Sequence, residues 1–465
     1  MTVSRQTAEA IETIINAKSL AVVGVSSNPE KEGFMTLETI IKGGYEGRLY
    51  PVNPKGGRIL DKQVYTSLAQ IPDQLDAVVI IVRASFVPGL IEEAAAKGAR
   101  GAIILSGGFR EAGRQDLEDE VKAAAQKTGL RIMGPNIQGI TYLPNKLCAM
   151  MFPALSVQGP LAIVSQSGSI TAALSEWAAR EGFGLSAAIN LGNQADLCES
   201  DYLDFFADDN QTGAIVLYLE GIKNGPQFLD SLKRAALKKP IAVLKTGRTP
   251  SGAKAAASHT GSLAGDYAVF AAACRQCGAY PAASLTELYD AAKGMAGIKP
   301  PQGNRLLIVS TSGGVCGISA DEAESRGLVV PPLPSGLKEE LEDLDLFSPL
   351  AHLANPMDLV DLFSSHFLEA ARRADARDAA DTILIFYGDP VPGGDEVILT
   401  LNDQAKASLA LGYLGGGEEE LKSRVSLQRQ GIPVFPSPDR ALSGIAAATW
   451  RADFLRKRNA VQEDM

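Results

Sequence analysis

The feature of the sequence that most constrains its fold is a regular alternation of short apolar segments with helical segments. Apolar segments such as 19–23, 101–105 and 131–133 are each followed by Gly or Ser, and a helical pattern such as 115–128 lies between two of them. This alternation predicts parallel strands, because parallel neighbours need a crossover connection of a dozen or more residues, usually a helix. We therefore predict an α/β protein.

Three domains are expected from the way this alternation restarts along the chain. The first is a Rossmann-like domain with one ligand cleft, and the other two are doubly wound, flavodoxin-like domains. Residues 143–158 are interpreted as a linker. The predicted domains span residues 1–142, 150–298 and 303–460.

The second and third domains share a sequence pattern. Leu161-Ala-Ile-Val-Ser165-Gln-Ser167-Gly168 matches Leu306-Leu-Ile-Val-Ser310-Thr-Ser312-Gly313, and a helical pattern follows both. This match suggests a duplicated domain. A strand, a Ser/Gly turn and a helix direct free backbone N–H groups and the positive end of the helix dipole at one point, where an anion can bind. A plain strand–helix turn explains either copy alone equally well.

The turns of the first domain favour a phosphorylated ligand over NAD. The turn from Gly24 to Gly33 does not have the GxGxxG spacing of NAD-binding folds. The second apolar strand ends in Asn53-Pro-Lys55, where an NAD-binding domain would carry an acidic residue for the ribose. A lysine suits a phosphate group better than a ribose diol. Coenzyme A is therefore expected here, and an NAD-dependent oxidoreductase is the alternative.

A candidate catalytic pair follows two consecutive apolar strands of the second domain. Glu220 comes after the strand 213–219, and residues 245–265, which contain His259, come after the strand 240–245. This last segment is rich in Gly, Ser, Thr and Ala, so we predict a loop at the carboxyl end of a strand. A carboxylate that accepts a hydrogen bond from one imidazole nitrogen makes the other nucleophilic, as a phosphohistidine requires. A surface histidine and a solvated strand end are the simpler interpretations.

Composition narrows the classes of partner. The net charge is −10, which argues against nucleic-acid binding. The sequence has no run of 18 or more apolar residues and no signal-peptide core at its start, so we expect a cytoplasmic protein with no membrane association. The five cysteines suggest no disulfide framework, and Cys274 and Cys277 fall inside a helical pattern, so we expect no metal site.

Taken together, these motifs resemble the α subunit of ADP-forming (NDP-forming) acyl-CoA synthetases, relatives of succinyl-CoA synthetase. The resemblance covers nearly the whole chain. The motifs that carry it are Val22-Val-Gly24-Val-Ser-Ser27, Tyr50-Pro-Val-Asn53-Pro-Lys55, Gly134-Pro-Asn136, Ile163-Val-Ser-Gln-Ser-Gly168, Leu219-Glu220-Gly221 and Ser258-His259-Thr-Gly261.

The resemblance implies a role for each motif. His259 is the residue that an enzyme-bound acyl phosphate phosphorylates, and Glu220 orients it. The phosphate is held by Ser165, Gln166, Ser167 and Gly168. The contacts to coenzyme A fall on Gly24, Ser26, Ser27, Lys55, Leu105, Ser106, Gly107 and Asn136.

It also implies the reaction and a partner. The expected activity is that of an acid–thiol ligase of the acetate–CoA ligase type, which interconverts acyl-CoA, ADP and phosphate with a small carboxylic acid, coenzyme A and ATP. The ATP-grasp part of the family is expected on a separate β subunit, which would bind ADP or ATP with Mg²⁺. A non-catalytic CoA-binding regulatory or scaffold protein is the alternative from another class.

Two positions depart from the family pattern. Ile137 follows Gly134-Pro-Asn136 where the family commonly has a cysteine, so a cysteine near the CoA thiol is not expected here. Ala172 stands where succinyl-CoA synthetases carry a tyrosine, which argues against succinate as the substrate.

Overall fold

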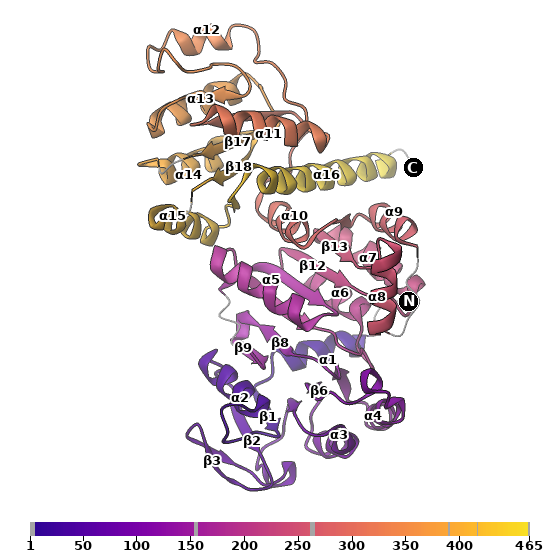
Figure 1. Ribbon diagram of the computed structural model, residues 1–465. Coiled ribbons are helices and arrows are strands. Elements are labelled where there is room, and N and C mark those ends of the chain that lie inside the picture. The colour runs from indigo at the N-terminus through magenta and orange to yellow at the C-terminus, as the bar shows by residue number, and fades with distance from the viewer. Residues whose placement is uncertain (1–4, 153–156, 261–265, 389–390, 416, 464–465) are drawn as a thin grey trace. The chain divides into compact units, whose positions relative to one another are not determined.

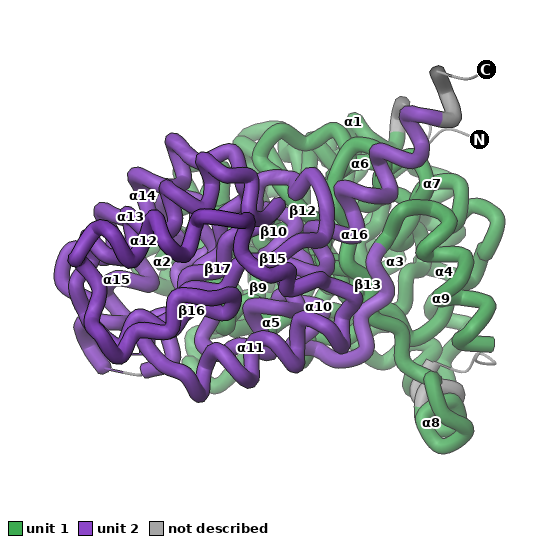
Figure 2. Tube along the Cα trace, turned by 90° about the horizontal axis from the view of Figure 1, so that it is seen from above, with its two compact units in different colours: residues 1–180, 184–279 green, residues 181–183, 280–465 purple. Residues whose placement is uncertain are grey.

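The computed structural model of the protein describes residues 5–152, 157–260, 266–388, 391–415 and 417–463, without the side chains of 5, 6, 256–260 and 461–463. The chain divides into two compact units, drawn in different colours in Figure 2. Unit 1 contains residues 1–180 and 184–279, and unit 2 contains residues 181–183 and 280–465. Among the described residues, every helix is too short or too polar to span a lipid bilayer.

Unit 1 begins with a parallel sheet whose strand order is β2-β1-β5-β6-β7, as predicted for a Rossmann-like domain. Leu20 and Val22 face one hydrophobic core with α1 and α2, and Ala21 and Val23 face the other with α3 and α4. The strands are therefore buried on both faces, which explains their continuous apolar runs. The elements are α1 (Arg5–Ile15), β1 (Ser19–Val23), α2 (Glu32–Lys42), β2 (Arg48–Val52), β5 (Ala77–Ile80), α3 (Val87–Ala96), β6 (Gly101–Ile104), α4 (Gln115–Thr128) and β7 (Arg131–Met133), with the antiparallel pair β3 (Gly57–Ile59) and β4 (Lys62–Val64) as an addition.

A second sheet follows, and its strands in unit 1 have the order β13-β12-β10-β11-β8-β9. Figure 1 labels β13, β12, β8 and β9 among them. Its first four strands are parallel, and β8 and β9 form an antiparallel pair beside β11. The segment 143–158 is thus wrongly interpreted as a linker, because it contains β9. The elements are β8 (Gly139–Tyr142), β9 (Leu147–Met150), β10 (Gln158–Ser165), α5 (Gly168–Glu181), β11 (Leu185–Asn190), α6 (Glu199–Asp208), β12 (Ala214–Leu219), α7 (Gly225–Lys238), β13 (Ile241–Lys245), α8 (Pro250–Thr260) and α9 (Tyr267–Cys277).

The prediction of a loop throughout 245–265 is wrong for residues 250–260, which form α8. A proline suits the first turn of a helix, where its missing N–H is not needed. The alanines of the sequence Ala253-Lys-Ala-Ala-Ala257 have the highest helix propensity of any residue. A segment of small side chains is therefore compatible with a helix as well as with the predicted loop. Residues 261–265 lie outside the described residues.

Unit 2 contains a third parallel sheet, in the order β16-β15-β17-β18-β19. Helix α10 packs along α16 and therefore belongs to unit 2. The sequence placed this helix in the second domain, which was predicted to end at residue 298. The elements are β14 (Tyr280–Pro281), α10 (Leu285–Gly297), β15 (Leu306–Ser310), α11 (Gly313–Ser325), α12 (Leu337–Glu342), β16 (Met357–Asp358), α13 (Ser364–Ala376), β17 (Thr382–Tyr387), α14 (Gly394–Gln404), β18 (Ser408–Tyr413), α15 (Glu418–Arg429), β19 (Val434–Phe435) and α16 (Pro438–Glu463).

Candidate active site

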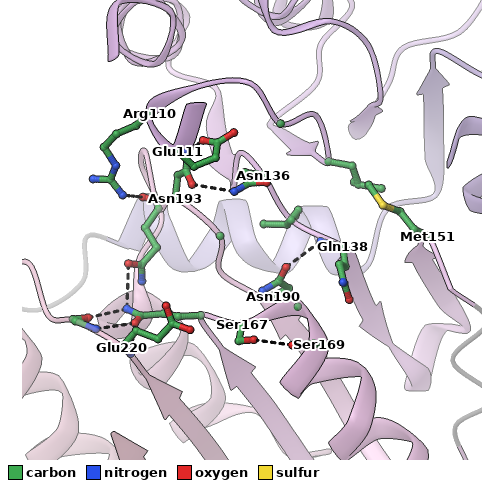
Figure 3. Close-up of a pocket in the computed structure, with 18 of the residues that line it drawn as sticks. Arg110, Glu111, Asn136, Gln138, Met151, Ser167, Ser169, Asn190, Asn193 and Glu220 are labelled. Carbon is green, nitrogen blue, oxygen red and sulfur yellow. Dashed lines mark hydrogen bonds between the residues drawn. The ribbon is translucent and has the colours of Figure 1, made fainter. Parts of the chain in front are cut away.

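A cavity of about 1000 Å³ lies within unit 1, and turns of both sheets of that unit contribute to its wall (Figure 3). Binding sites of α/β proteins occur outside the carboxyl ends of the strands, and the cavity is placed accordingly. Among its lining residues are Leu105, Gly107 and Asn136 from the first sheet and Ser167, Gly168 and Glu220 from the second. The structure therefore brings part of the predicted CoA-binding, phosphate-binding and catalytic sets to one cavity. The described residues that line it do not include Gly24, Ser26, Ser27, Lys55, Ser106 and Ser165.

The turn after β1 carries the predicted CoA residues Gly24, Ser26 and Ser27. Gly24 has φ +96°, and a Cβ atom there would lie 1.9 Å from the carbonyl oxygen of Ile81, so a side chain is excluded. The Asn53 side chain donates to the Val25 carbonyl at 2.7 Å and accepts from the Lys55 N–H at 2.9 Å. The backbone of the exposed Lys55 is thereby held next to the first turn, and contact of its side chain with a phosphate stays a prediction.

The turns after β6 and β7 are joined to each other. Asn136, which has φ +60°, donates its backbone N–H to the Ser106 carbonyl at 2.9 Å. The Ser106 hydroxyl accepts from the Val82 N–H at 2.9 Å. Gly107 lies against Asn136, since a Cβ atom on it would be 3.3 Å from Asn136 Oδ1. Hydrogen bonds therefore join Ser106 to Asn136, and Gly107 and Asn136 line the cavity.

Glu111 caps the turn after β6, a role that the sequence analysis did not identify. Its Oε1 accepts from the N–H groups of Gly108 at 2.6 Å and Phe109 at 3.0 Å, and its Oε2 accepts from Asn193 Nδ2 at 2.6 Å. Partial burial raises the pKa of this carboxyl, but the hydrogen bonds from Asn193, Phe109 and Gly108 outweigh it and hold the pKa below its usual value. Glu111 is therefore a stable anion in the cavity wall.

The turn between β10 and α5 contains the predicted phosphate-binding residues, some of which hold the turn together while others line the cavity. Ser165 is fully buried, and its hydroxyl donates to the Ser167 carbonyl at 2.8 Å. The Gln166 Oε1 accepts from the N–H groups of Glu220 at 2.5 Å and Gly221 at 3.0 Å, and its Nε2 donates to the Gly221 carbonyl at 2.7 Å. Ser167 and Gly168, at the start of α5, face the cavity. The Ser165 and Gln166 side chains thus shape the turn.

Glu220 follows β12, and β12 pairs in parallel with β13, with Leu219 beside Lys245. The sequence prediction that Glu220 and His259 follow neighbouring parallel strands is confirmed at the level of the strands. The backbone of His259 lies in α8, but its side chain lies outside the described residues. Contact between His259 and Glu220 stays a prediction.

Sequence reasoning missed the turn after β11, whose residues Gly192, Asn193 and Gln194 line the cavity. Gly192 has φ +54°, and a Cβ atom there would lie 2.3 Å from the Pro135 carbonyl. Lys223 Nζ donates to the carbonyls of Asn193 at 2.7 Å and Gln194 at 2.8 Å. Burial, and then the positive charge of Arg110, lower the pKa of Lys223 to about 8. The sequence Gly192-Asn-Gln194, which comes shortly after a buried strand, could have indicated a further turn at the carboxyl end of the sheet.

Two family models match the chain within unit 1 and the start of unit 2. A CoA binding domain model matches residues 18–143, and a succinyl-CoA ligase-like flavodoxin domain model matches residues 158–295. The first match covers the strands and turns that carry the predicted CoA residues, and the second covers the Ser165 turn, Glu220 and His259.

Relatives extend the match over nearly the whole chain. The α subunit of acetate–CoA ligase (ADP-forming) I of Pyrococcus furiosus is 38% identical, with 96% of this chain and 100% of that protein covered. The 4-hydroxybutyrate–CoA ligase (ADP-forming) of Nitrosopumilus maritimus is 31% identical over 95% of this chain, which spans 64% of that longer protein. The solved structure of the dinucleotide-forming acetyl-coenzyme A synthetase 1 of Candidatus Korarchaeum cryptofilum, in complex with phosphate and ADP, is 33% identical with a TM-score of 0.87, and 96% of this chain and 98% of that one are covered.

The CoA binding domain, the succinyl-CoA ligase-like flavodoxin domain and the relatives that match nearly the whole chain together define an ADP-forming acid–CoA ligase. The chain belongs to the family of α subunits of ADP-forming acetyl-CoA synthetases, which is similar to succinyl-CoA synthetase.

Proposed function

We propose that this chain catalyses the acyl and phosphoryl steps of an ADP-forming acetate–CoA ligase, and that a separate ATP-grasp subunit holds ADP or ATP with Mg²⁺. The observation that carries the proposal is the single cavity lined by residues of the predicted CoA, phosphate and catalytic sets. A CoA-binding scaffold has no need of Glu220 and the Ser167–Gly168 helix start in the wall of the same cavity.

Coenzyme A is proposed to bind at the first sheet, with Lys55 and the turn at Gly24, Ser26 and Ser27 on its phosphate groups. The turn of Leu105, Ser106 and Gly107, together with Asn136, would then receive the thiol end, because Leu105, Gly107 and Asn136 line the cavity. The apolar side chains of Ile137, Ile222 and Met151 also line this cavity and suit a short acyl chain. Acetate or another small acid is therefore the proposed substrate class.

Two chemical steps are proposed to take place on this chain, before the phosphoryl group passes to ADP on the partner. A phosphate oxygen attacks the thioester carbon, the carbon–sulfur bond breaks, and the proton that phosphate loses goes to the CoA sulfur. A nitrogen of His259 then attacks the phosphorus of the acyl phosphate, and the carboxylate leaves. The N–H groups at the start of α5 near Ser167 and Gly168 hold the phosphate, since a helix N-terminus stabilises negative charge. Glu220 stabilises the positive charge that develops on the imidazole.

Gln166 is proposed as a positioning residue in this scheme, beside its predicted place in the phosphate-binding set. Its side chain amide holds the backbone of Glu220 and Gly221 through three hydrogen bonds of 2.5–3.0 Å. The Glu220 carboxylate is thereby directed by the same turn that starts the phosphate-binding helix. His259 must carry its phosphoryl group to a nucleotide on the partner, so we propose that α8 changes position during turnover.

The test is an assay of the purified chain with coenzyme A, ATP, Mg²⁺ and a panel of carboxylic acids, with and without a co-expressed ATP-grasp partner. We expect acyl-CoA, ADP and phosphate to form only with the partner, acetate to be among the accepted acids, and a chelator of Mg²⁺ to stop the reaction. ATP-dependent acyl-CoA formation by the chain alone would contradict the two-subunit proposal. Binding of NADH instead of coenzyme A in calorimetry would overturn the assignment of the first domain.

A further inference from the structure

The side chain of Asn193 lies at the centre of the hydrogen bonds around the cavity, and it is almost completely buried, with 6% of its surface exposed (Figure 3). Its Nδ2 donates to Glu111 Oε2 at 2.6 Å and to Glu118 Oε2 at 2.9 Å. Its Oδ1 accepts from Asn136 Nδ2 at 3.3 Å. One amide from the second sheet thus contacts three side chains of the CoA-binding domain.

The two domains of unit 1 are also joined by interactions that do not involve this side chain. The backbone N–H groups of residues 193, 195 and 197 donate to the carbonyls of Pro135, Gly134 and Ile132 at 2.9, 2.9 and 3.2 Å. Arg131 pairs with both carboxylate oxygens of Asp196 at 2.8 Å. Because this ladder remains when the Asn193 side chain changes, variants at this position are expected to keep the domains together.

The Asn193 side chain instead reaches past the ladder to the turns that are predicted to receive coenzyme A. Glu111, its first acceptor, holds the N–H groups of Gly108 and Phe109 with its other oxygen. Asn136, its donor, is bonded through its backbone to Ser106. A change at Asn193 is therefore transmitted to both turns through one intervening side chain each.

We propose that Asn193 is a positioning residue for coenzyme A, which holds the Ser106–Phe109 turn and Asn136 in register with the turn after β11, so that the CoA thiol meets the acyl group in the cavity. This inference rests on the function proposed above. It separates two halves of the reaction: the CoA-dependent acyl step needs Asn193, and the transfer of a phosphoryl group from ATP to His259 does not.

Asn193→Asp is the sharpest test because it keeps the shape of the side chain. The new carboxylate cannot donate to Glu111 or Glu118 and faces both of their charges. Asn136 can still donate to the new carboxylate, but a buried charge that faces two glutamates costs enough that we expect kcat/KM for coenzyme A to fall on the order of 10- to 100-fold. Phosphorylation of His259 by ATP and the partner should change by less than about twofold. Asn145→Asp, which makes the same charge change in unit 1 beside Asn16, is the matched control and should alter neither step.

Two further measurements exclude a merely structural role. As the pH falls, the new carboxylate gains a proton and can donate again, so the activity of Asn193→Asp relative to the wild type should rise, while that of Asn145→Asp stays level. In the double variant Glu111→Gln with Asn193→Asp, the amide and the carboxylate exchange places and the direct bond is restored. This pair should recover part of kcat/KM for coenzyme A, and the remaining loss reflects Glu118.

Each outcome decides between the claims. Equal loss of both half-reactions in Asn193→Asp, or unchanged kcat/KM for coenzyme A, would overturn the positioning role. If the wild-type chain itself showed no phosphorylation of His259, the proposed function would fail instead. Calorimetric titration of the isolated chain with coenzyme A then still tests Asn193: the variant should bind more weakly than the Asn145→Asp control, and equal affinity would contradict the inference.

Discussion

The turn at Ser165–Gly168 in unit 1 and the turn at Ser310–Gly313 in unit 2 have the same architecture and different chemistry. Each follows a strand and begins a helix, α5 or α11. In the sheets, Ser165 pairs with Tyr218 and Ser310 pairs with Phe386. Two residues further along, Glu220 and Gly388 therefore occupy equivalent places. Unit 2 therefore has a glycine at the position where the proposed catalytic pair requires a carboxylate.

The second residue of each turn holds the same backbone position with a different side chain. Gln166 accepts from the N–H of Glu220 at 2.5 Å, and the Thr311 hydroxyl accepts from the N–H of Gly388 at 2.8 Å. A polar side chain at this place is thus part of the fold in both units. The two units therefore share the turn and its hydrogen bond to the neighbouring strand and differ in the residue that this bond holds.

The neighbouring strand places a neutral side chain beside one helix start and a carboxylate beside the other. Asn190 pairs with Ser165, and its amide donates to the Ser165 carbonyl at 3.1 Å. Asp358 pairs with Ser310, and its Oδ2 would lie 2.9 Å from a Cβ atom on Gly313, the first residue of α11. A neutral amide leaves the start of α5 open to a phosphate, whereas the Asp358 carboxylate places a negative charge beside the start of α11.

The largest difference between the two units is expected in the rate of His259 phosphorylation when the second residue of each turn is changed. Gln166→Leu removes the three hydrogen bonds to Glu220 and Gly221, so the Glu220 carboxylate loses its orientation. We expect phosphorylation of His259 to slow by roughly 10- to 100-fold, a loss typical of a misplaced catalytic group. Thr311→Val, the matched variant in unit 2, should slow it far less and should lower the free energy of unfolding by about 1 kcal/mol. Equal slowing in both variants would contradict the distinction between the two turns.

A smaller effect is expected from exchanging the charges of the neighbouring strands. Asn190→Asp gives unit 1 the charge of unit 2 and should raise KM for phosphate about tenfold, equivalent to about 1.4 kcal/mol, measured in the direction of acyl-CoA consumption with the partner present. Asp358→Asn should change that KM by less than about twofold. It should lower the free energy of unfolding by about 0.3–1 kcal/mol, because a negative charge near a helix N-terminus is stabilising. A greater rise in KM for Asp358→Asn than for Asn190→Asp would indicate that phosphate binds in unit 2 and would contradict this account.

The sheets and turns were predictable because their signals are local. Buried parallel strands are continuous apolar runs, and a following Gly or Ser marks the carboxyl end, so the positions of Gly24, Ser165 and Glu220 could be read from the sequence. The adjacency of β12 and β13 also followed from chain order. The predicted α/β fold is confirmed: two of its three large sheets are parallel, and the second combines four parallel strands with the antiparallel pair β8 and β9.

Features that depend on long-range contacts could not be predicted. Asn193 donates hydrogen bonds to Glu111 and Glu118, which lie 82 and 75 residues away in the sequence. The residues around Asn193 in the sequence do not indicate these partners. The β9 strand was missed because it pairs antiparallel with β8 outside the βαβ alternation. Helix α8 was missed because Gly, Ser and Ala are compatible with both a loop and a helix, and the choice between them depends on packing.

The most direct test of the account is to map the phosphorylated residue after incubation with labelled ATP, Mg²⁺ and the partner, or with labelled phosphate and acyl-CoA. We predict acid-labile, base-stable label on the peptide that contains His259, no label in His259→Asn, and strongly slowed labelling in Glu220→Gln, because the amide keeps the size of the side chain but not its charge. Label on a unit 2 peptide that contains His352 or His366, or full labelling of His259→Asn, would contradict the assignment of the chemistry to unit 1.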